Sequence, residues 1–321
     1  MARFVVQRIL ISFLVVLGVS FLVFAILNLT PGDPARLMLG QMAPQEAVDQ
    51  LNEELGMNKP FLQRYVDYVW KAVTKLDFGR SYTTNEPVFS EIMRAFPKTL
   101  TIALFSVFFA SIIGVPMGVY SAVKQYSAGD TLLTVTAMFL AAVPAFLLGM
   151  ILTLVFSLNL KILPNYGSAT IKHYILPIVT VTLPAAAALL RLTRSTMLET
   201  IRQDYIRTAL SKGMPDRQVI FRHALKNALL PIITIMGLSF GGLLGGTILV
   251  EKTFSIAGLG MLEILAIQKK DVPLVMATTI FLAAVFNMII LVVDILYAFI
   301  DPRIKARFVK SRRKKAQEAL R

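Results

Sequence analysis

Six long apolar runs, separated by polar segments, divide the chain. Each run is long enough for an α-helix to cross the hydrocarbon core of a bilayer, which takes about 20 residues. Backbone amides in lipid have to bond within their own segment, so the runs are expected to be helical. The pattern predicts an all-α polytopic membrane protein with six transmembrane helices, over residues 9–27, 99–122, 132–157, 174–193, 228–250 and 275–299.

Several runs contain proline, which removes one intrahelical hydrogen bond and kinks a helix. Transmembrane helices tolerate proline where neighbouring groups satisfy the freed carbonyl, so the runs still count as spans. Kinks are expected at Pro116, Pro144, Pro177, Pro184 and Pro231.

The first run follows Arg3 and Arg8 and so shares a basic start with secretory signal peptides. The apolar region of a signal peptide is only about 7–15 residues long, and a small-residue cleavage site follows it. Residues 9–27 make a run of 19, and no such site follows. We expect a retained transmembrane helix.

The distribution of Lys and Arg orients the spans, because cytoplasmic loops carry an excess of both. The 191–230 loop has eight cations and the tail after Tyr297 has nine, whereas the short loops 158–173 and 251–274 have two and three. Both termini are therefore predicted to be cytoplasmic. With 56% hydrophobic and 16% charged residues, the composition also lies outside the norm for a soluble protein.

Four parts follow from this arrangement. Residues 1–29 form a cytoplasmic N-terminus with the first span, and 30–98 form an extracytoplasmic helical segment. Residues 99–300 form the transmembrane core, which includes a cytoplasmic loop at 194–227, and 301–321 form a basic cytoplasmic tail.

The 30–98 segment is too long for a plain connection and contains two helical patterns. Ala47, Leu51 and Leu55 recur every four residues, and Gly56 can end that helix. Pro60 suits a first helical turn. One apolar stripe follows it, made of Leu62, Tyr65, Val66, Val69, Trp70 and Val73. The segment is expected either to cap the protein's own spans or to dock an outer partner.

The residue types argue against an enzyme. The chain has no cysteine, and His173 and His223 lie far apart without neighbouring acids, so neither thiolate chemistry nor a metal site is indicated. No nucleophile or paired-carboxylate arrangement stands out, so we predict no catalytic residue. The sequence also lacks a GxxxxGK[ST] phosphate loop. Any work that the protein performs has to be driven by a partner or by an ion gradient.

Two features of the spans leave alternatives open. Asp294 is the clearest charge within a span, and it is either a functional acid or a structural acid that pairs with a cation or a helix end. The spans have few titratable groups, and a proton-coupled secondary carrier usually needs a relay of them. This argues against such a carrier, but a sodium site made of backbone carbonyls stays open. Gly241 and Gly245 are small residues at a spacing of four, and they either pack against another helix or line a pathway.

The basic loop 191–230 cannot lie in lipid, at about 2.5–3.5 kcal/mol per cation at the bilayer centre. One face of a helix predicted over 197–212 carries Leu198, Ile201, Tyr205 and Ala209. Gly213 stops this helix and Asp216 restarts one. We predict a helix, a glycine elbow and a second helix, joined at both ends to spans.

Three interpretations of this loop compete. A cationic amphipathic helix can lie on anionic lipid, at about 1 kcal/mol per cation near the surface. A DNA-binding helix-turn-helix shares the local pattern, although this segment is tethered to the bilayer at both ends. The third interpretation is a lever, a short helix that inserts into a cleft of a soluble motor and moves the spans behind it.

Sequence motifs favour the lever. The stretches DYIRTALSKG (204–213) and ALKNALLP (224–231) resemble the cytoplasmic signature loop of permeases in ATP-binding-cassette (ABC) importers. More narrowly, the chain resembles the permeases of dipeptide, oligopeptide and nickel importers, also through residues 27–40, 241–260 and 291–305. The usual Glu-Ala-Ala opening of the signature is replaced by Arg207-Thr208-Ala209, which is typical of the peptide branch.

The resemblance implies a type I ABC importer transmembrane domain in the bacterial inner membrane. Two homologous permeases, two ATPases that bind ATP and Mg, and an extracytoplasmic binding protein would form the transporter, with no cofactor in this chain. The substrate would be a di- or oligopeptide, or alternatively a nickel chelate or glutathione. Residues 204–214 would form the coupling helix seated in an ATPase, through Asp204, Arg207, Thr208, Ala209, Lys212, Gly213 and Met214.

The resemblance also points to the outer end of the fifth span. There the segment 251–260 would touch the binding protein or gate the outer mouth of the pathway. Together with the two glycines, the candidate pathway or gate residues are Gly241, Gly245, Glu251, Phe254 and Gly258.

Overall fold

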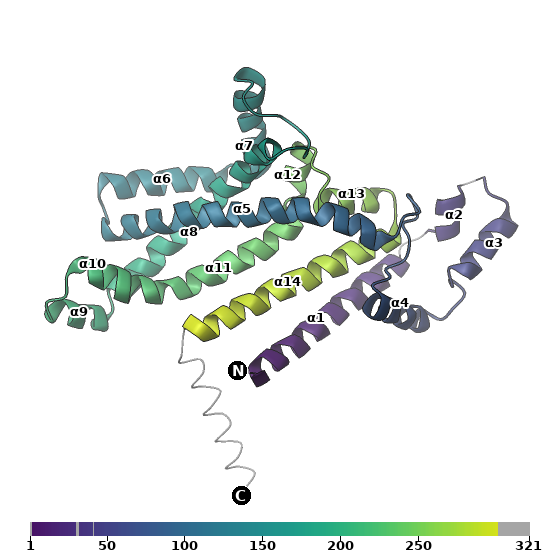
Figure 1. Ribbon diagram of the computed structural model, residues 1–321, viewed down its shortest axis with the longest axis horizontal. Helices are drawn as coiled ribbons and strands as arrows, with labels where there is room; N and C mark the ends of the chain where they lie inside the picture. The colour runs from purple at the N-terminus through teal and green to yellow at the C-terminus, as the bar shows by residue number, and fades with distance from the viewer. Residues whose placement is uncertain (1, 30–31, 41, 301–321) are drawn as a thin grey trace, which may run out of the picture.

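The computed structural model describes residues 2–29, 32–40 and 42–300, and within them nearly every segment is helical (Figure 1). Five helices are long and apolar enough to cross a membrane. They are α1 (Ala2–Leu29), α5 (Val88–Val123), α8 (Lys172–Ile201), α11 (Leu225–Gly246) and α14 (Val272–Ile300). These five helices confirm the spans predicted over residues 9–27, 99–122, 174–193, 228–250 and 275–299. The predicted basic tail, 301–321, lies outside the described residues.

The third predicted span, over 132–157, was expected to kink at Pro144, and the helix breaks there; counted as one bent span, it brings the described residues to six spans. This region forms α6 (Ala128–Ala142), then α7 (Ala145–Leu152) and the π-helix η1 (Thr153–Asn159), and the two halves are bent by 100°. Pro144 follows Val143, whose backbone is extended (φ −80°, ψ 124°), because a residue before proline is pushed out of the helical region. In Figure 1, α7 and the π-helix point away from the bundle.

The other prolines expected to kink helices stay inside continuous ones. Pro116 lies within α5, Pro177 and Pro184 within α8, and Pro231 within α11. Proline therefore ends a helix in this protein only where the preceding residue also leaves the helical conformation, at least among these five positions.

The α5 and α8 helices form the most extensive helix pair (Figure 1). Gly114 and Gly118 of α5 face α8, and a Cβ on Gly118 would lie only 2.5 Å from the Cβ of Thr193. Small residues let the two backbones approach closely, as in other membrane helix pairs. This contact sets the position of α8 in the bundle.

The α1 and α14 helices pack against each other, and an ion pair joins them. Arg8 Nη1 lies 2.8 Å from Asp294 Oδ2, and the Asp294 side chain is largely buried. This pair confirms the interpretation of Asp294 as an acid that pairs with a cation.

The long extracytoplasmic segment folds into α2 (Pro34–Leu39), α3 (Gln45–Glu54) and α4 (Phe61–Lys75). Asp33 caps α2, because its carboxylate accepts hydrogen bonds from the amides of Ala35 and Arg36. Asn52 of α3 donates to the same carboxylate at 2.9 Å, and this bond is the main cause that lowers the pKa of Asp33. Gly56, with φ of +71°, ends α3 as predicted.

The short helices α12 (Ile248–Thr253) and α13 (Leu259–Gln268) complete the outer end of the bundle, on the side of α2 to α4. At the other end lie α9 (Asp204–Ser211) and α10 (Asp216–Gln218), which belong to the basic loop. The positive-inside pattern makes that end cytoplasmic.

Glycines on α11 provide a test of helix packing. A Cβ on Gly241 would lie 2.4 Å from Cδ2 of Phe286 on α14, whereas nothing lies within 4 Å of the same atom on Gly245. We expect Gly241→Ala to destabilise the purified full chain by about 1–3 kcal/mol, because overpacking forces a shift of the ring. Gly245→Ala is the matched control, and alanine there favours the helix. Thermal unfolding in detergent measures both, and equal midpoints would contradict this packing.

Candidate functional site

The basic loop starts with a break in the helix that leaves the membrane. The α8 helix ends at Ile201, and Gln203 adopts an extended conformation (φ −73°, ψ 148°) before α9 begins. The prediction of one helix over 197–212 is therefore wrong. The extended residue turns the chain, so α9 begins with a new orientation.

This break changes which side chains of α9 face the protein. Ile206 is 1% exposed and Ala209 is buried beside it, but Tyr205, predicted on the inner face, is 43% exposed. The Tyr205 hydroxyl instead accepts a hydrogen bond from Asn227 Nδ2 at 3.0 Å. Ile206 was missed because the predicted face assumed that α8 continues without interruption.

Gly213 forms the predicted elbow. Its φ is +77°, in the region that favours glycine, and no other atom lies within 4 Å of a Cβ placed there. The amide of Gly213 donates to the carbonyl of Leu210, and that of Met214 donates to the carbonyl of Ala209. These two bonds form a Schellman motif, in which the residue after the glycine packs back on the helix. Met214 accordingly packs against the adjacent core.

Beyond the elbow, the chain returns to the membrane without a further break. The α10 helix continues through the π-helix η2 (Val219–Ala224) into α11, and Asp216–Gly246 forms one candidate span. Ile206 of α9, Val219 of η2 and Met197 of α8 belong to one buried cluster. The α9 helix thus packs on η2 and shares one buried cluster with α8.

The other side of α9 is open. Asp204, Arg207, Thr208, Lys212 and Gly213 are exposed, whereas Ala209 is buried and Met214 partly buried. The structure therefore divides the seven predicted coupling residues into an exposed set and an anchoring pair. Leu210 adds an exposed apolar side chain to the open surface.

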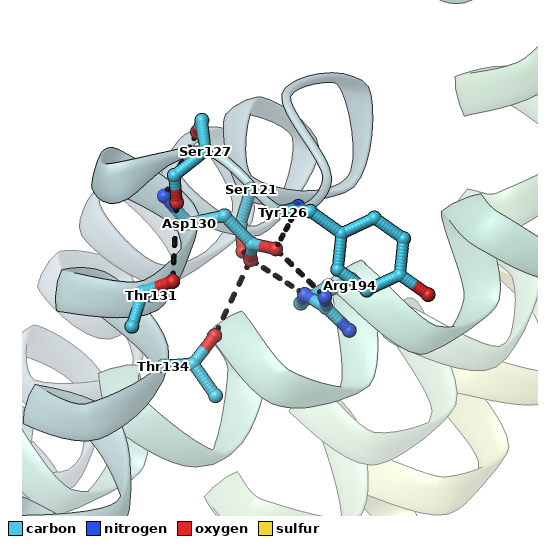
Figure 2. A network of polar contacts seen from close by, with 7 residues as sticks. All are labelled: Ser121, Tyr126, Ser127, Asp130, Thr131, Thr134 and Arg194. Atoms are coloured by element: carbon cyan, nitrogen blue, oxygen red, sulfur yellow. Dashed lines mark hydrogen bonds and ion pairs between the residues drawn. The ribbon is translucent and has the colours of Figure 1, made fainter.

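A polar network, shown in Figure 2, ties the base of this loop to two other helices. Arg194 of α8 forms a bidentate pair with Asp130 of α6, with Nε–Oδ1 at 2.7 Å and Nη2–Oδ2 at 2.8 Å. Asp130 also accepts hydrogen bonds from the Ser121 hydroxyl and the Tyr126 amide. Thr134 donates to the same carboxylate at 3.3 Å.

This network connects the end of α5, the α5–α6 turn and the start of α6 to α8. The side chain of Asp130 is 4% exposed and that of Arg194 is 24% exposed. The ion pair is not predicted from the sequence, in which Arg194 is only one of the loop cations. A weak signal was available: Asp130 follows the helix-capping residue Ser127, whose hydroxyl accepts from the Asp130 amide.

At the outer end, Glu251 is fully buried among hydrogen-bond donors. Its carboxylate accepts from the hydroxyls of Thr99 (2.6 Å) and Thr247 (3.0 Å) and from the amide of Met261 (2.9 Å). Gly258 touches this carboxylate, and a Cβ there would lie 2.4 Å from Oε1. Glu251 and Gly258 thus join α12, α5 and α13.

Phe254 is buried on the other side of α12 and contacts Gly149 of α7. Its carbonyl accepts a hydrogen bond from the amide of Gly167 at 2.9 Å. Three predicted gate residues, Glu251, Phe254 and Gly258, therefore come together in one packed outer unit. Gly241 lies deeper, against α14, and Gly245 has open space beside it.

Within the described residues, no group of three or more His, Asp or Glu side chains is placed to hold a metal ion. The arrangement as a whole is that of a membrane permease: a helical bundle, an exposed short helix in a basic loop at the cytoplasmic end and a packed outer end.

Comparison with known proteins is consistent with this class. Residues 114–306 match the family described as the inner membrane component of binding-protein-dependent transport systems, and residues 1–103 match the corresponding N-terminal part. The chain belongs to this family and is a permease subunit of an ABC importer in the bacterial inner membrane.

Two relatives are the glutathione transport system permease proteins GsiC of Escherichia coli (strain K12) and Shigella flexneri serotype 5b (strain 8401). Each is 38% identical over 305 residues, which cover 95% of this chain and 99% of the relative. Among solved structures, the inward facing MetNI methionine ABC transporter aligns with a TM-score of 0.54 at 19% identity, over 67% of this chain and 99% of the other. This likeness shows the fold.

The Asp130–Arg194 pair yields a stability prediction. Arg194→Gln leaves a buried carboxylate without its cation, and losing one partner of a buried pair costs about 3 kcal/mol or more. The thermal unfolding midpoint of the full chain in detergent should fall. The double variant Asp130→Asn/Arg194→Gln should recover most of the loss, because it leaves no uncompensated charge buried.

Arg191→Gln is the matched control, because Arg191 is an exposed cation one turn away on α8. It should leave the midpoint unchanged. A single variant as stable as this control, or a double variant as unstable as Arg194→Gln, would contradict the role of the ion pair.

Proposed function

We propose that this chain forms half of the translocation pathway of an ATP-driven importer for short peptides. A second, homologous permease forms the other half, two ATPase subunits bind ATP and Mg, and an extracytoplasmic binding protein delivers the substrate. The observation that carries the proposal is the exposed α9 helix, which packs on η2 and shares a buried cluster with α8, in a chain of this family.

The α9 helix serves as the coupling element. Its inner side chains, Ile206 and Ala209, are buried with residues of α8 and η2, so a force on α9 reaches both membrane helices. Its outer surface offers Arg207 and Lys212 to an acidic cleft of an ATPase. Closure of the ATPases on ATP pushes α9 and turns the spans outward, and hydrolysis resets them.

The outer unit of Glu251, Phe254 and Gly258 forms a rigid rim at the outer mouth. Because Glu251 binds donors from α5, α12 and α13, these elements move together when α8 and α11 turn. Gly245, with open space beside it, faces the pathway.

Linear di- and oligopeptides are the proposed substrates. Glutathione is the second candidate, since GsiC proteins, named for glutathione transport, are similar to this chain along almost its whole length. Glutathione is itself a tripeptide, with its first peptide bond through the side-chain carboxyl of glutamate. A nickel chelate is a third possibility within the same family.

Uptake into proteoliposomes that contain this chain with its permease, ATPase and binding-protein partners tests the substrate. ATP-dependent uptake of a labelled linear tripeptide, with no competition by glutathione or nickel, is the expected result. Uptake of glutathione alone would replace the linear peptide by the second candidate. Uptake driven by a proton or sodium gradient without ATP would refute the proposed importer.

The coupling role of α9 is tested by charge reversal in the same vesicles. Arg207→Glu should lower ATP-driven uptake about tenfold or more, because a like-charge contact in an interface costs more than about 1.4 kcal/mol. Binding of substrate to the binding protein should not change.

Arg222→Glu is the control, since Arg222 is an exposed cation of the same loop that lies on η2 instead of α9. It should keep most of the uptake. Equal loss in both variants would show that the total charge of the loop matters. Full activity of Arg207→Glu would refute α9 as the contact with the ATPase.

A further inference from the structure

The side chains of α4 divide into three sectors around the helix, at 100° per residue. One sector faces α1 and contains Phe61, Tyr65 and Tyr68. A second sector is polar and contains Asp67, Lys71 and Lys75. The third sector is apolar and exposed, and its members are Leu62, Val66, Trp70 and Val73, each 61–68% exposed.

The first sector holds α4 against α1. The Tyr65 hydroxyl donates to the carbonyl of Leu17 at 3.0 Å, and its ring lies 5.2 Å from that of Phe21, centroid to centroid. Arg64 Nη2 donates to Asn28 Oδ1 at 2.6 Å. Aromatic contacts and hydrogen bonds at several points fix how α4 is rotated about its own axis.

These contacts place α4 beside the membrane-spanning part of α1. The apolar span of α1 is Val6–Leu29, and the residues that α4 contacts lie between Leu17 and Asn28. At 1.5 Å per residue, Leu17 is about 18 Å from the end of α1, so α4 packs along the outer half of this span. In Figure 1, α4 lies next to that end of α1.

The membrane-spanning helix on which α4 packs also has exposed apolar side chains of its own. Leu14, Leu22 and Ile26 of α1 are exposed apolar side chains of a transmembrane helix. The apolar sector of α4 adjoins the sector that packs on α1, whereas the charged side chains lie on the remaining side. Trp70 is at the border between apolar and polar sectors, and tryptophan is enriched where a membrane meets water.

We propose that α4 is an interfacial helix, with its exposed apolar sector inserted into the leaflet of the bilayer at the C-terminal end of α1. Lipid acyl chains cover Leu62, Val66 and Val73, Trp70 lies at the level of the headgroups, and Lys71 and Lys75 reach water. Helices with one charged face and one apolar face adopt this position in membranes. The outer segment is thereby anchored to lipid as well as to α1, whatever the transported substrate.

Trp70 is the single tryptophan of the chain, so its fluorescence reports on this helix alone. The full chain is reconstituted into liposomes made with or without lipids brominated on the upper part of the acyl chain. The expected result is blue-shifted emission, strong quenching by the brominated lipid and weak quenching by acrylamide present on both sides of the membrane.

Two moved tryptophans provide matched controls on the conservative Trp70→Phe background. Val66→Trp, in the exposed apolar sector, should be quenched by brominated lipid as Trp70 is. Lys71→Trp, in the polar sector, should be quenched by acrylamide and not by brominated lipid.

Other results overturn the proposal. Red-shifted emission of Trp70 with strong acrylamide quenching would place the apolar sector in water, free for an outer partner. Blue-shifted emission without quenching by either agent would show that protein, such as a second copy of this chain, covers it. Similar quenching at positions 66 and 71 would mean that α4 has no fixed orientation in the leaflet.

Discussion

The close packing of α8 on α5 determines the position of the cytoplasmic end of the protein. Gly118 allows the backbones to approach until Thr193 fills the space that a side chain would occupy. One residue later, Arg194 reaches Asp130 of α6. Met197, one turn further, belongs to the same buried cluster as Ile206 of α9. The α5–α8 contact therefore positions both the ion pair with α6 and the cluster that holds α9.

The two ends of the bundle use charge in different ways. At the cytoplasmic end, Arg207 and Lys212 stay exposed, whereas Arg194 and Arg8 each pair with a largely buried aspartate. At the outer end, acids are buried without a cation: Glu251 accepts from threonine hydroxyls, and Asp271 accepts from Ser81 and Thr83. Buried carboxylates that are fully hydrogen-bonded rigidify the structure around them. A rigid outer rim and an accessible cytoplasmic surface suit a subunit that is driven from the cytoplasm.

The apolar surface of α4 is larger than its contact with α1. Tyr65 lies in that contact, whereas Val66 and Trp70 stay exposed. The two interpretations of the sequence, an intramolecular cap or an exposed docking surface, each describe one side of this helix. Under the proposed insertion, lipid and not an outer partner covers the exposed side.

The sequence by itself determined the number of apolar runs, the orientation of the chain, the elbow at Gly213 and the family. These properties depend on local composition, on a single left-handed residue and on motifs that are contiguous in the chain. Pro144 marked in the sequence where the third span could kink, but only the tertiary structure decided that the bend is as large as 100°, that Ile206 is buried in place of Tyr205 and that Asp130 pairs with Arg194. Each of these depends on how one helix is placed and rotated relative to another. Periodicity within one segment carries no information about that placement, because the contacts that set it join residues far apart in the sequence.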